Sequence, residues 1–302
     1  MTQRNRRIAL LAERGFVPAG TLRFPYARLM TTTLVRDALE EDGADNDITS
    51  IATVVSDRRA RCAVIARQPG IIAGIPLARE AFKQRNPKVV VRNMVKDGQR
   101  VEAGAQVMFI TGHARGLLSA ERVALNYMQR LSGVATLTGQ FVEAVTGTGA
   151  KILDTRKTTP GWRRLEKYAV RAGGGMNHRM DLATAVLIKD NHLAAVDGQI
   201  ALAVKRARET APAGTFVEVE CDRIEQVLDA IGAEAEIIML DNMTIEDMRE
   251  AVELINGRAV TEASGGVALD TVRNVAKSGV DWISVGALTH SAKAMDLALD
   301  FE

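Results

Sequence analysis

The stretch at residues 215–242, TFVEVECDRIEQVLDAIGAEAEIIMLDN, decides the class of fold. It opens with TFVEVE, a short run rich in β-branched and aromatic residues that is typical of a strand. Apolar residues at helical spacing follow at 222–232, and a second apolar run, EIIML, occupies 236–240. A strand, a helix and another strand in this order predict two parallel strands joined by a helical crossover.

The same alternation extends in both directions along the chain. Further helices are expected at 245–256 and 269–278. The segments expected to form strands are KIL at 151–153, AVLI at 185–188, TFVEVE at 215–220, EIIML at 236–240, RAVTEA at 258–263 and DWISV at 281–285. Six such units predict an α/β barrel or an open α/β sheet, and periodicity alone does not choose between them.

The chain before this alternation has a different character. Residues 50–112 contain apolar runs punctuated by Pro and Gly, with a hairpin signal at Asp97-Gly98. A helix is expected to end at Gly43, and two helices are expected within 119–147, separated near Ser132-Gly133. These patterns predict a small α+β domain ahead of the α/β domain.

We therefore predict a first domain at 1–122, a catalytic domain at 123–289, and a tail at 290–302 that packs back on the first domain. The basic start of the chain, residues 1–16, is expected to be a solvated extension with a short helix.

Polar or glycine residues follow every predicted strand of the α/β part. In barrels and open α/β sheets the chemistry lies at the carboxyl ends of the strands, which share one edge. These strand-end residues are Asp154 to Lys157, Lys189 to His192, Glu220, Asp241-Asn242, Ser264 to Gly266, and Gly286-Ala287. Six such endings predict one functional rim.

Positive charge is concentrated on one side of this rim. Residues 151–192 hold nine Lys and Arg against four Asp and Glu, although the whole chain has a formal net charge of only +2. Arg156, Lys157, Arg179 and Lys189 follow strand ends or a glycine run, and a site for a strongly negative ligand is expected there. Other cations of the segment, notably Arg163, Arg164 and Lys167, are expected on a solvated helix face.

Two further features complete the rim. The glycine turns after the last two strands can expose backbone N–H groups to a phosphate, although they could equally serve only as tight turns. Glu220 and Asp241 end neighbouring strands, where they could bind Mg²⁺ or ribose hydroxyls, or simply balance Lys157 and Lys189. Cations and acids together suit a phosphorylated sugar.

Composition excludes several classes of function. A net charge of +2 does not favour nucleic acid, and no apolar run reaches the roughly 20 residues that cross a membrane. The two cysteines, Cys62 and Cys221, show no metal-ligand spacing and indicate a reduced, cytoplasmic setting.

The motifs along the chain resemble those of the quinolinate phosphoribosyltransferases. They are ERVALNYMQRLSGVAT at 121–136, DTRKTTPG at 154–161, EKYAVRAGGGMNHRMDL at 166–182, VLIKDNH at 186–192, VEVE at 217–220, LDN at 240–242, SGG at 264–266 and GVDWISVGALTHS at 279–291. EEDGADNDITS at 40–50 and ARQPGIIAG at 66–74 fit the first domain of that family. The resemblance covers the chain from about residue 30 to its end.

This resemblance implies an α/β sandwich domain followed by a six-strand α/β barrel with its active site at the strand C-terminal ends. It also implies Mg²⁺ as cofactor and a homodimer with shared active sites, and it leaves open whether dimers assemble further. The substrates would be quinolinate and phosphoribosyl pyrophosphate, and the products nicotinate mononucleotide, CO₂ and pyrophosphate.

Site residues carry over position by position. Those implied to surround quinolinate and pyrophosphate are Arg122 from the partner subunit, Thr155, Arg156, Lys157, His178, Arg179 and Lys189. Glu220 and Asp241 would face the ribose and Mg²⁺. The residues implied to bind phosphate are Ser264, Gly265, Gly266, Val285, Gly286 and Ala287.

Three alternatives remain. A paralogous pyrophosphorylase associated with molybdenum transport shares much of the framework and acts on a different base. Lys189 at a strand end would also suit a Schiff-base enzyme. The segment VKDGQRVEAGAQV at 95–107 resembles a biotinyl or lipoyl carrier, but its bend, Gly98 to Arg100, lacks the lysine that is modified.

Overall fold

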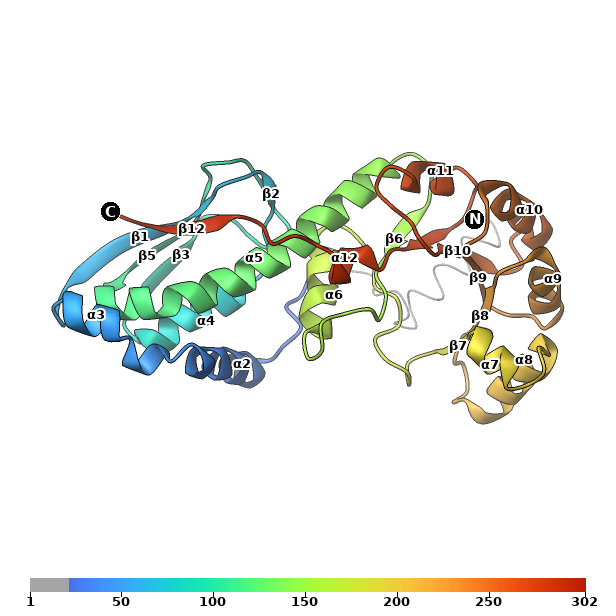
Figure 1. Ribbon diagram of the computed structural model, residues 1–302, viewed down its shortest axis with the longest axis horizontal. Coiled ribbons are helices and arrows are strands. Elements are labelled where there is room, and N and C mark those ends of the chain that lie inside the picture. Colours follow the sequence, from blue (N-terminus) through green and yellow to red (C-terminus); the bar gives the residue numbers. More distant parts are fainter. Residues whose placement is uncertain (1–21) are drawn as a thin grey trace. The chain divides into compact units, whose positions relative to one another are not determined.

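The computed structural model describes residues 22–302, which form two compact units (Figure 1). The units are the sandwich unit, residues 22–139, 164–174 and 292–302, and the barrel unit, residues 140–163 and 175–291. The extension with a short helix predicted for residues 1–16 lies outside the described residues. Within residues 22–302, no helix combines the length and the apolar character needed to cross a membrane.

The sandwich unit contains a four-stranded antiparallel sheet in the order β12-β1-β5-β3. Its centre is apolar, because Val64 pairs with Leu299 on one side and Met108 on the other. The strands of this unit are β1 (Arg59–Ala66), β2 (Gly70–Ile71), β3 (Val90–Asn93), β4 (Arg100–Val101), β5 (Gln106–His113) and β12 (Leu297–Phe301).

Helices cover this sheet, with α4 and α5 running along one side of it (Figure 1). Helix α2 buries Thr31, Val35 and Leu39, whose spacing of four residues puts them on one face. It ends shortly before Gly43, which has a φ of +63°, as the sequence predicted. The helical segments besides α5 (Ala114–Ala144) are α2 (Arg28–Glu41), η1 (Ala44–Asn46), α3 (Ile48–Thr53), α4 (Ile75–Arg85) and α6 (Arg163–Ala172). Lys167 of α6 is buried, so its predicted position on a solvated helix face is wrong.

Helix α5 is continuous, so the break predicted near Ser132-Gly133 is wrong. Gly133 serves a close approach instead, since a Cβ at this position would lie 2.0 Å from the carbonyl oxygen of Lys293. Ser132 Oγ accepts a hydrogen bond from the Ala73 amide at 2.9 Å. The small residues therefore admit neighbouring backbone without interrupting the helix. The same continuous helix carries the chain past the predicted boundary at 122/123, and the sandwich unit continues to Gly139.

The hairpin expected at Asp97-Gly98 is also wrong. Strand β3 pairs with β5, whereas β4 pairs with β2, so the two runs flanking Asp97 do not pair with each other. Asp97 instead accepts hydrogen bonds from the amides of Gly74 and Ile75, at 3.0 and 3.1 Å, where α4 begins. The Tyr168 hydroxyl donates to the same carboxylate at 2.7 Å. The side chain of Asp97 thus acts as a tertiary helix cap, which a local turn signal does not reveal.

The C-terminal segment belongs to the sandwich unit from Ala292 onward. Its strand β12 pairs antiparallel with β1, from Cys62 opposite Phe301 to Ala66 opposite Leu297. The predicted tail at 290–302 thus supplies an edge strand of this sheet.

The barrel unit is built on six parallel strands in the order β6-β11-β10-β9-β8-β7. Their bounds are β6 (Lys151–Leu153), β7 (Val186–Ile188), β8 (Val217–Cys221), β9 (Ile237–Asp241), β10 (Val260–Ser264) and β11 (Trp282–Ser284). The helices between and after them are α7 (Asp190–Ala194), α8 (Ile200–Thr210), α9 (Ile224–Gly232), α10 (Ile245–Ile255), α11 (Val272–Ala276) and α12 (Ala287–His290). All six predicted strands are confirmed.

A shared apolar core shows that this sheet curves around an interior. Each strand, or the residue directly before it, contributes one buried side chain to a single cluster. These residues are Leu153, Ala185, Phe216, Ile237, Val260 and Trp282. An α/β barrel is therefore the architecture, rather than a flat open sheet.

Side chains of a strand alternate between its two faces, so residues two positions apart share a face. Along β8, the residues on the face of Phe216 are Glu218 and Glu220. Along β10, they are Glu262 and Ser264, in line with Val260. The barrel interior thus changes along the strands from apolar, through a layer that holds two glutamates, to a polar rim at the carboxyl ends.

Candidate active site

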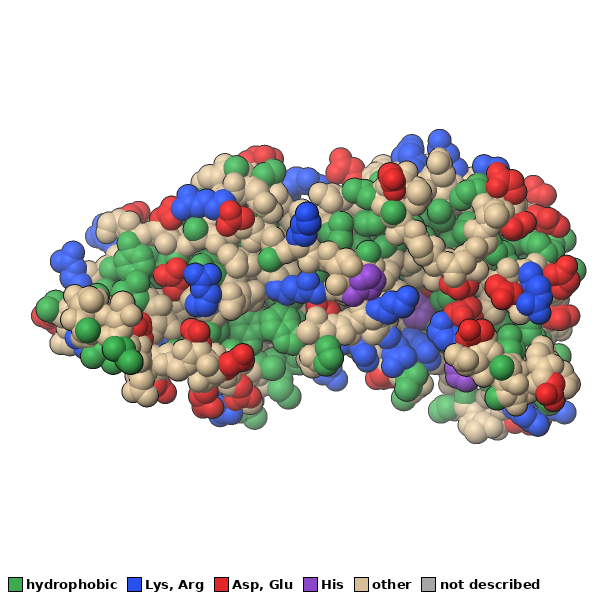
Figure 2. All heavy atoms as spheres, in the orientation of Figure 1, with side chains coloured by type: hydrophobic (Ala, Val, Ile, Leu, Met, Phe, Trp, Pro, Cys, Tyr) green, Lys and Arg blue, Asp and Glu red, His purple; other side chains and the backbone are tan. Residues whose placement is uncertain are grey.

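A cavity of about 510 Å³ opens at the carboxyl ends of the barrel strands. It is lined by Thr155, Arg156, Lys157, His178, Arg179, Leu187, Lys189, Glu220, Met239, Asp241, Asn242, Glu262, Ser264, Gly265, Gly266 and Ser284. Figure 2 shows basic side chains and histidines gathered beside acidic ones over the barrel unit. The polar residues after five of the six strands therefore meet at one site, as the sequence predicted.

The loop after β6 carries the first group of cations. Thr155 Oγ1 accepts a hydrogen bond from the Lys157 amide at 3.0 Å, which folds the loop into a tight turn. Within residues 22–302, the buried Nε atom of Arg156 has no hydrogen-bond partner, and neither does the buried Nε of Arg179. Buried donors normally have partners, so these two indicate a site for an external acceptor.

The loop that carries His178 is anchored to the same strand end by Asp154, which is fully buried. The Asp154 carboxylate accepts from Asn177 Nδ2 at 2.6 Å and from the His178 amide at 2.9 Å. The neighbouring Arg179 donates through Nη1 to the carbonyl of Ala185 at 2.8 Å. One buried acid therefore sets the position of His178, which the sequence had placed in the site without a structural reason.

Two acidic residues, Glu220 on β8 and Asp241 on β9, line the cavity. Lys189 Nζ forms an ion pair with Glu220, so the cation after β7 and the acid of β8 are neighbours. On β9, the Asp241 carboxylate accepts from Asn242 Nδ2 at 2.7 Å. Asn242 has a φ of +55°, and it packs against Gly265, where an added Cβ would lie 2.1 Å from Asn242 Oδ1. Gly265 is thus required by this contact as well as by its own φ of +93°.

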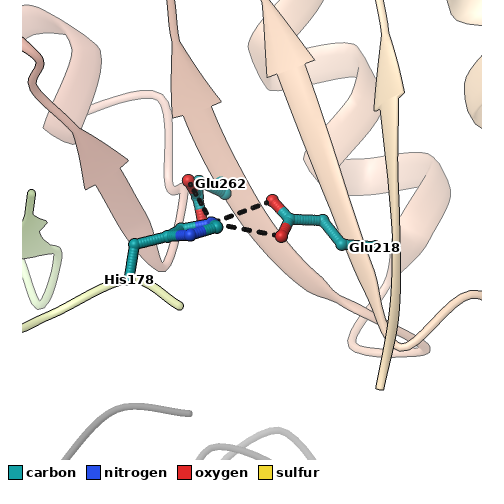
Figure 3. Close-up of side chains that lie close together, drawn as sticks. All are labelled: His178, Glu218 and Glu262. Carbon is teal, nitrogen blue, oxygen red and sulfur yellow. Dashed lines mark hydrogen bonds and ion pairs between the residues drawn. The ribbon is translucent and has the colours of Figure 1, made fainter. Parts of the chain in front are cut away.

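The structure adds two acids that the sequence analysis did not select. Glu218 and Glu262 are fully buried in the barrel interior, and both face the ring of His178 (Figure 3). His178 Nε2 lies 3.1 Å from Glu218 Oε2 and 3.5 Å from Glu262 Oε1. Both glutamates stand inside strands that are largely buried, between two valines on β8 and between Thr261 and Ala263 on β10. A charged residue in such a run is the signal that could have identified them.

Burial changes the acidity of two groups in this site. Burial, and then the neighbouring charge of Glu218, raise the pKa of Glu262 above its ordinary value. Burial lowers the pKa of the Arg179 guanidinium, and the charge of Arg156 lowers it further, while Glu218 opposes both. Like charges are therefore crowded on both sides of the cavity, an arrangement that a charged ligand could relieve.

Four predicted site residues do not line this cavity. Val285 is buried, and its amide donates to the Leu153 carbonyl. Gly286 precedes α12, and Ala287 is the first residue of that helix. Gly286 still lies beside the site, because a Cβ there would be 3.2 Å from Lys157 Cδ. Arg122 is exposed on α5 in the sandwich unit, so its role in a partner's site stays a prediction.

Comparison with protein families finds the same two-part organisation. Residues 47–132 match the quinolinate phosphoribosyl transferase N-terminal domain, and residues 134–300 match the C-terminal domain of the same family.

Individual relatives agree with the family match. A nicotinate-nucleotide pyrophosphorylase (carboxylating) from Mycobacterium leprae (strain TN) is 44% identical over 274 residues, covering 88% of this chain and 95% of that protein. A probable enzyme of the same name from Bacillus subtilis (strain 168) is 42% identical over 260 residues, covering 86% and 89% of the two chains. The solved nicotinate-nucleotide pyrophosphorylase from Francisella tularensis superposes with a TM-score of 0.87 at 39% identity, covering 94% of this chain and all of that one.

Proposed function

The chain belongs to the quinolinate phosphoribosyl transferase family, and we propose that it transfers phosphoribose from phosphoribosyl pyrophosphate to quinolinate. The 2-carboxylate is lost as CO₂, and the products are nicotinate mononucleotide and pyrophosphate, as in de novo NAD biosynthesis. The names of the relatives favour this reaction over the alternative that the chain acts on a different base, as the paralogue associated with molybdenum transport does.

The observation that carries the proposal is the cation-lined cavity with unpaired buried donors. Arg156, Lys157, Arg179 and Lys189 line one cavity, and the Nε atoms of Arg156 and Arg179 have no hydrogen-bond partner within residues 22–302. The proposed substrates are a dicarboxylate and a polyphosphate, which repel each other. A dense set of cations in a partly enclosed site offsets this repulsion, and guanidinium groups suit carboxylate and phosphate oxygens.

The chemistry follows from charge and position. The pyridine nitrogen of quinolinate attacks C1 of the ribose while the bond from C1 to pyrophosphate breaks, and positive charge develops on the sugar. The carboxylates of Glu220 and Asp241 line the same cavity and can stabilise that charge. The N-alkylated pyridinium then accepts the electron pair of the bond to the departing CO₂, and a proton from solvent restores C–H at that carbon. Positioning and electrostatics therefore supply most of what the reaction needs.

Mg²⁺ fits the donor set of the acidic side of the cavity. Glu220 and Asp241 offer carboxylate oxygens, the ligands that Mg²⁺ prefers, and they lie in a cavity that also suits a polyphosphate. When bound, Mg²⁺ would neutralise charge on the pyrophosphate group. Lys189 already neutralises Glu220 in its absence, so this lysine would be freed to bind a substrate anion when the acid takes another partner.

The 5′-phosphate is proposed to bind at the turn Ser264 to Gly266. Both glycines have positive φ angles, +93° and +58°, which orient backbone N–H groups in ways that other residues rarely allow. The predicted helix at 269–278 begins only at Val272, so the turn itself, rather than a helix end, must supply the donors. The predicted contribution of Val285, Gly286 and Ala287 remains part of this proposal.

A homodimer with shared sites is also proposed, with Arg122 of one subunit reaching the cavity of the other. The exposed position of Arg122 on α5 supports this. Mixing inactive Arg122→Ala and Lys189→Ala subunits should restore part of the activity, since one kind of site then has both residues. Heterodimers that form but stay inactive would contradict shared sites.

A cytoplasmic location completes the proposal. The two cysteines, Cys62 and Cys221, are both free and buried, which suits a reducing compartment.

The reaction is tested by following pyrophosphate and CO₂ release with quinolinate, phosphoribosyl pyrophosphate and Mg²⁺. Release of both products in equal amounts is expected, and chelation of Mg²⁺ should stop it. Nicotinate serves as the matched substrate, because it lacks the 2-carboxylate. Turnover of nicotinate with none of quinolinate would overturn the assignment.

A further inference from the structure

Three buried groups meet beneath the cavity, and the proposed reaction has no step for two of them. His178 is 5% exposed, and Glu218 and Glu262 are 0% exposed. His178 Nε2 points between the two carboxylates, 3.1 and 3.4 Å from the oxygens of Glu218 and 3.5 Å from Glu262 Oε1 (Figure 3). His178 and Glu262 line the cavity, whereas Glu218 does not.

Two buried glutamates in this layer of the barrel lower the stability of the fold. Burying a carboxylate costs several kcal/mol unless it is paired. Other strands fill the same layer with apolar side chains, Leu187 on β7 and Met239 on β9, which bury without this cost. Packing alone therefore does not account for Glu218 and Glu262.

The contacts fix the ring of His178 from two sides. An ionised carboxylate only accepts hydrogen bonds, so two of them facing Nε2 favour the imidazolium form, in which both ring nitrogens carry protons and Nδ1 is also a donor. The backbone of His178 is held independently, because its amide donates to Asp154 at 2.9 Å. Glu262 is held in turn, since the Ser284 hydroxyl donates to it. Buried groups thus set both the position of Nε2 and its protonation.

The cations around this cluster place a bound anion next to the imidazole of His178. Arg179 and Lys189 lie close enough for their charges to act on Glu218 and Glu262 respectively. These cations line the cavity together with His178, so an anion bound there meets the imidazole on the cavity side. The two acids meet the ring at its Nε2 atom (Figure 3).

We infer that Glu218 and Glu262 are positioning residues that hold His178 as an oriented hydrogen-bond donor to the carboxylates of the pyridine substrate. This inference rests on the proposed function. The glutamates do not touch the substrate themselves; they act through the imidazole, as carboxylates that orient histidines do elsewhere. Their contribution is to binding of the base rather than to binding of the sugar phosphate.

A double-mutant cycle tests the inference. Glu262→Gln and Glu218→Gln keep size but remove the charge, and each should raise the KM for quinolinate about 10- to 100-fold, with a smaller change in the KM for phosphoribosyl pyrophosphate. In a His178→Ala background neither change should have a further effect, because the ring on which they act is gone. Glu262→Asp, which keeps the charge, should recover part of the loss.

Asp281→Asn is the matched control. Asp281 is another buried acid of this sheet, but it precedes β11 at the opposite end and accepts from the Thr261 amide and hydroxyl, both at 2.9 Å. Its effect on quinolinate KM should be small, and it should add to that of His178→Ala. Equal effects of Glu262→Gln with and without His178, or equal changes in both substrate KM values, would overturn the inference.

A readout without turnover separates this inference from the proposed reaction. The chain has four histidines, and His178→Ala identifies the ¹⁵N signals of this ring. Both of its ring nitrogens should be protonated in the wild type, and the signals should shift in Glu262→Gln, whether or not quinolinate is the substrate. Wild-type signals that show either ring nitrogen unprotonated would overturn the inference. So would one equivalent of tightly bound metal in the purified protein that is lost in both glutamine variants, because these three residues could also bind a cation.

Discussion

The two ends of the barrel sheet differ in how completely their charged side chains are hydrogen-bonded. At the amino ends, Asp281 is satisfied by the Thr261 amide and hydroxyl, and Glu236 accepts from Arg208 and from the Val217 amide. At the carboxyl ends, Arg156 and Arg179 keep buried donors without a hydrogen-bond partner in the described part of the chain. Complete pairing stabilises the fold, whereas incomplete pairing leaves binding capacity for a ligand.

The largest difference between the ends should appear when an arginine is removed from each. Arg156→Ala should lower kcat/KM by about 10²- to 10³-fold, because it removes a donor to an anion in a partly enclosed site. Arg208→Ala, at the amino end, loses an ion pair with Glu236 whose arginine is 40% exposed, and should retain activity. Steady-state kinetics and circular dichroism on both variants make the comparison. A fully active Arg156→Ala enzyme would remove the distinction between the two ends.

A glycine at each end provides the next contrast. Gly265→Ala adds a Cβ at a φ of +93° and 2.1 Å from Asn242 Oδ1, which must displace the side chain that holds Asp241. We expect activity to fall about 10²-fold, as for a misplaced reacting group, with a loss of stability of about 1–3 kcal/mol. At Gly232, which ends α9, an added Cβ meets nothing within 4 Å, so Gly232→Ala should be neutral or slightly stabilising. Similar activities of the two variants would show that the Asn242 contact does not matter.

A buried acid at the amino end should affect stability alone. Asp281→Asn weakens the hydrogen bonds to Thr261 and should cost about 1–3 kcal/mol of unfolding free energy. The activity of each folded molecule should stay unchanged, because these groups lie away from the cavity. Urea denaturation and kinetics on the same preparation measure both quantities. An active-site defect at unchanged stability would contradict the separation of the two ends.

A last expected effect is the pH dependence of stability that Glu262 contributes. Its pKa is raised in the folded protein from an ordinary value of 4.5, so the folded state binds more protons than the unfolded state between the two values. Stability from this group is present at low pH and is lost as pH rises through the folded pKa, by up to about 1.4 kcal/mol per pH unit. Glu262→Gln should therefore gain stability relative to the wild type as pH rises from about 4.5 to about 7. A constant difference in melting temperature over this range would contradict the raised pKa.

Much of the site could be predicted from residues that follow strands. Thr155, Lys189, Glu220 and Asp241 were selected because each comes directly after or at the end of an apolar run, and all of them line the cavity. Parallel strands bring their carboxyl ends together, so local sequence is enough to group such residues. Glu218 was missed because it lies inside a strand rather than at its end, where its charge within a buried run was the available signal.

The errors in the fold have a similar origin. Gly133 and Asp97-Gly98 carry local signals of a helix end and of a hairpin, respectively. Each instead serves a distant contact, with Lys293 in the first case and with Gly74 and Ile75 in the second. Propensities describe a residue among its neighbours in sequence, and a tertiary contact can override them.

The sequence by itself determined the alternation of strands and helices, the polar rim and the concentration of cations between residues 151 and 192. These follow from periodicity and composition, which act over a few residues. Only the tertiary structure decided that β6 pairs with β11, that β12 completes the sheet of the sandwich unit, and that His178 meets Glu218 and Glu262. Those contacts join residues 40 to more than 230 positions apart, and they depend on how the strands pack around a common core rather than on any local pattern.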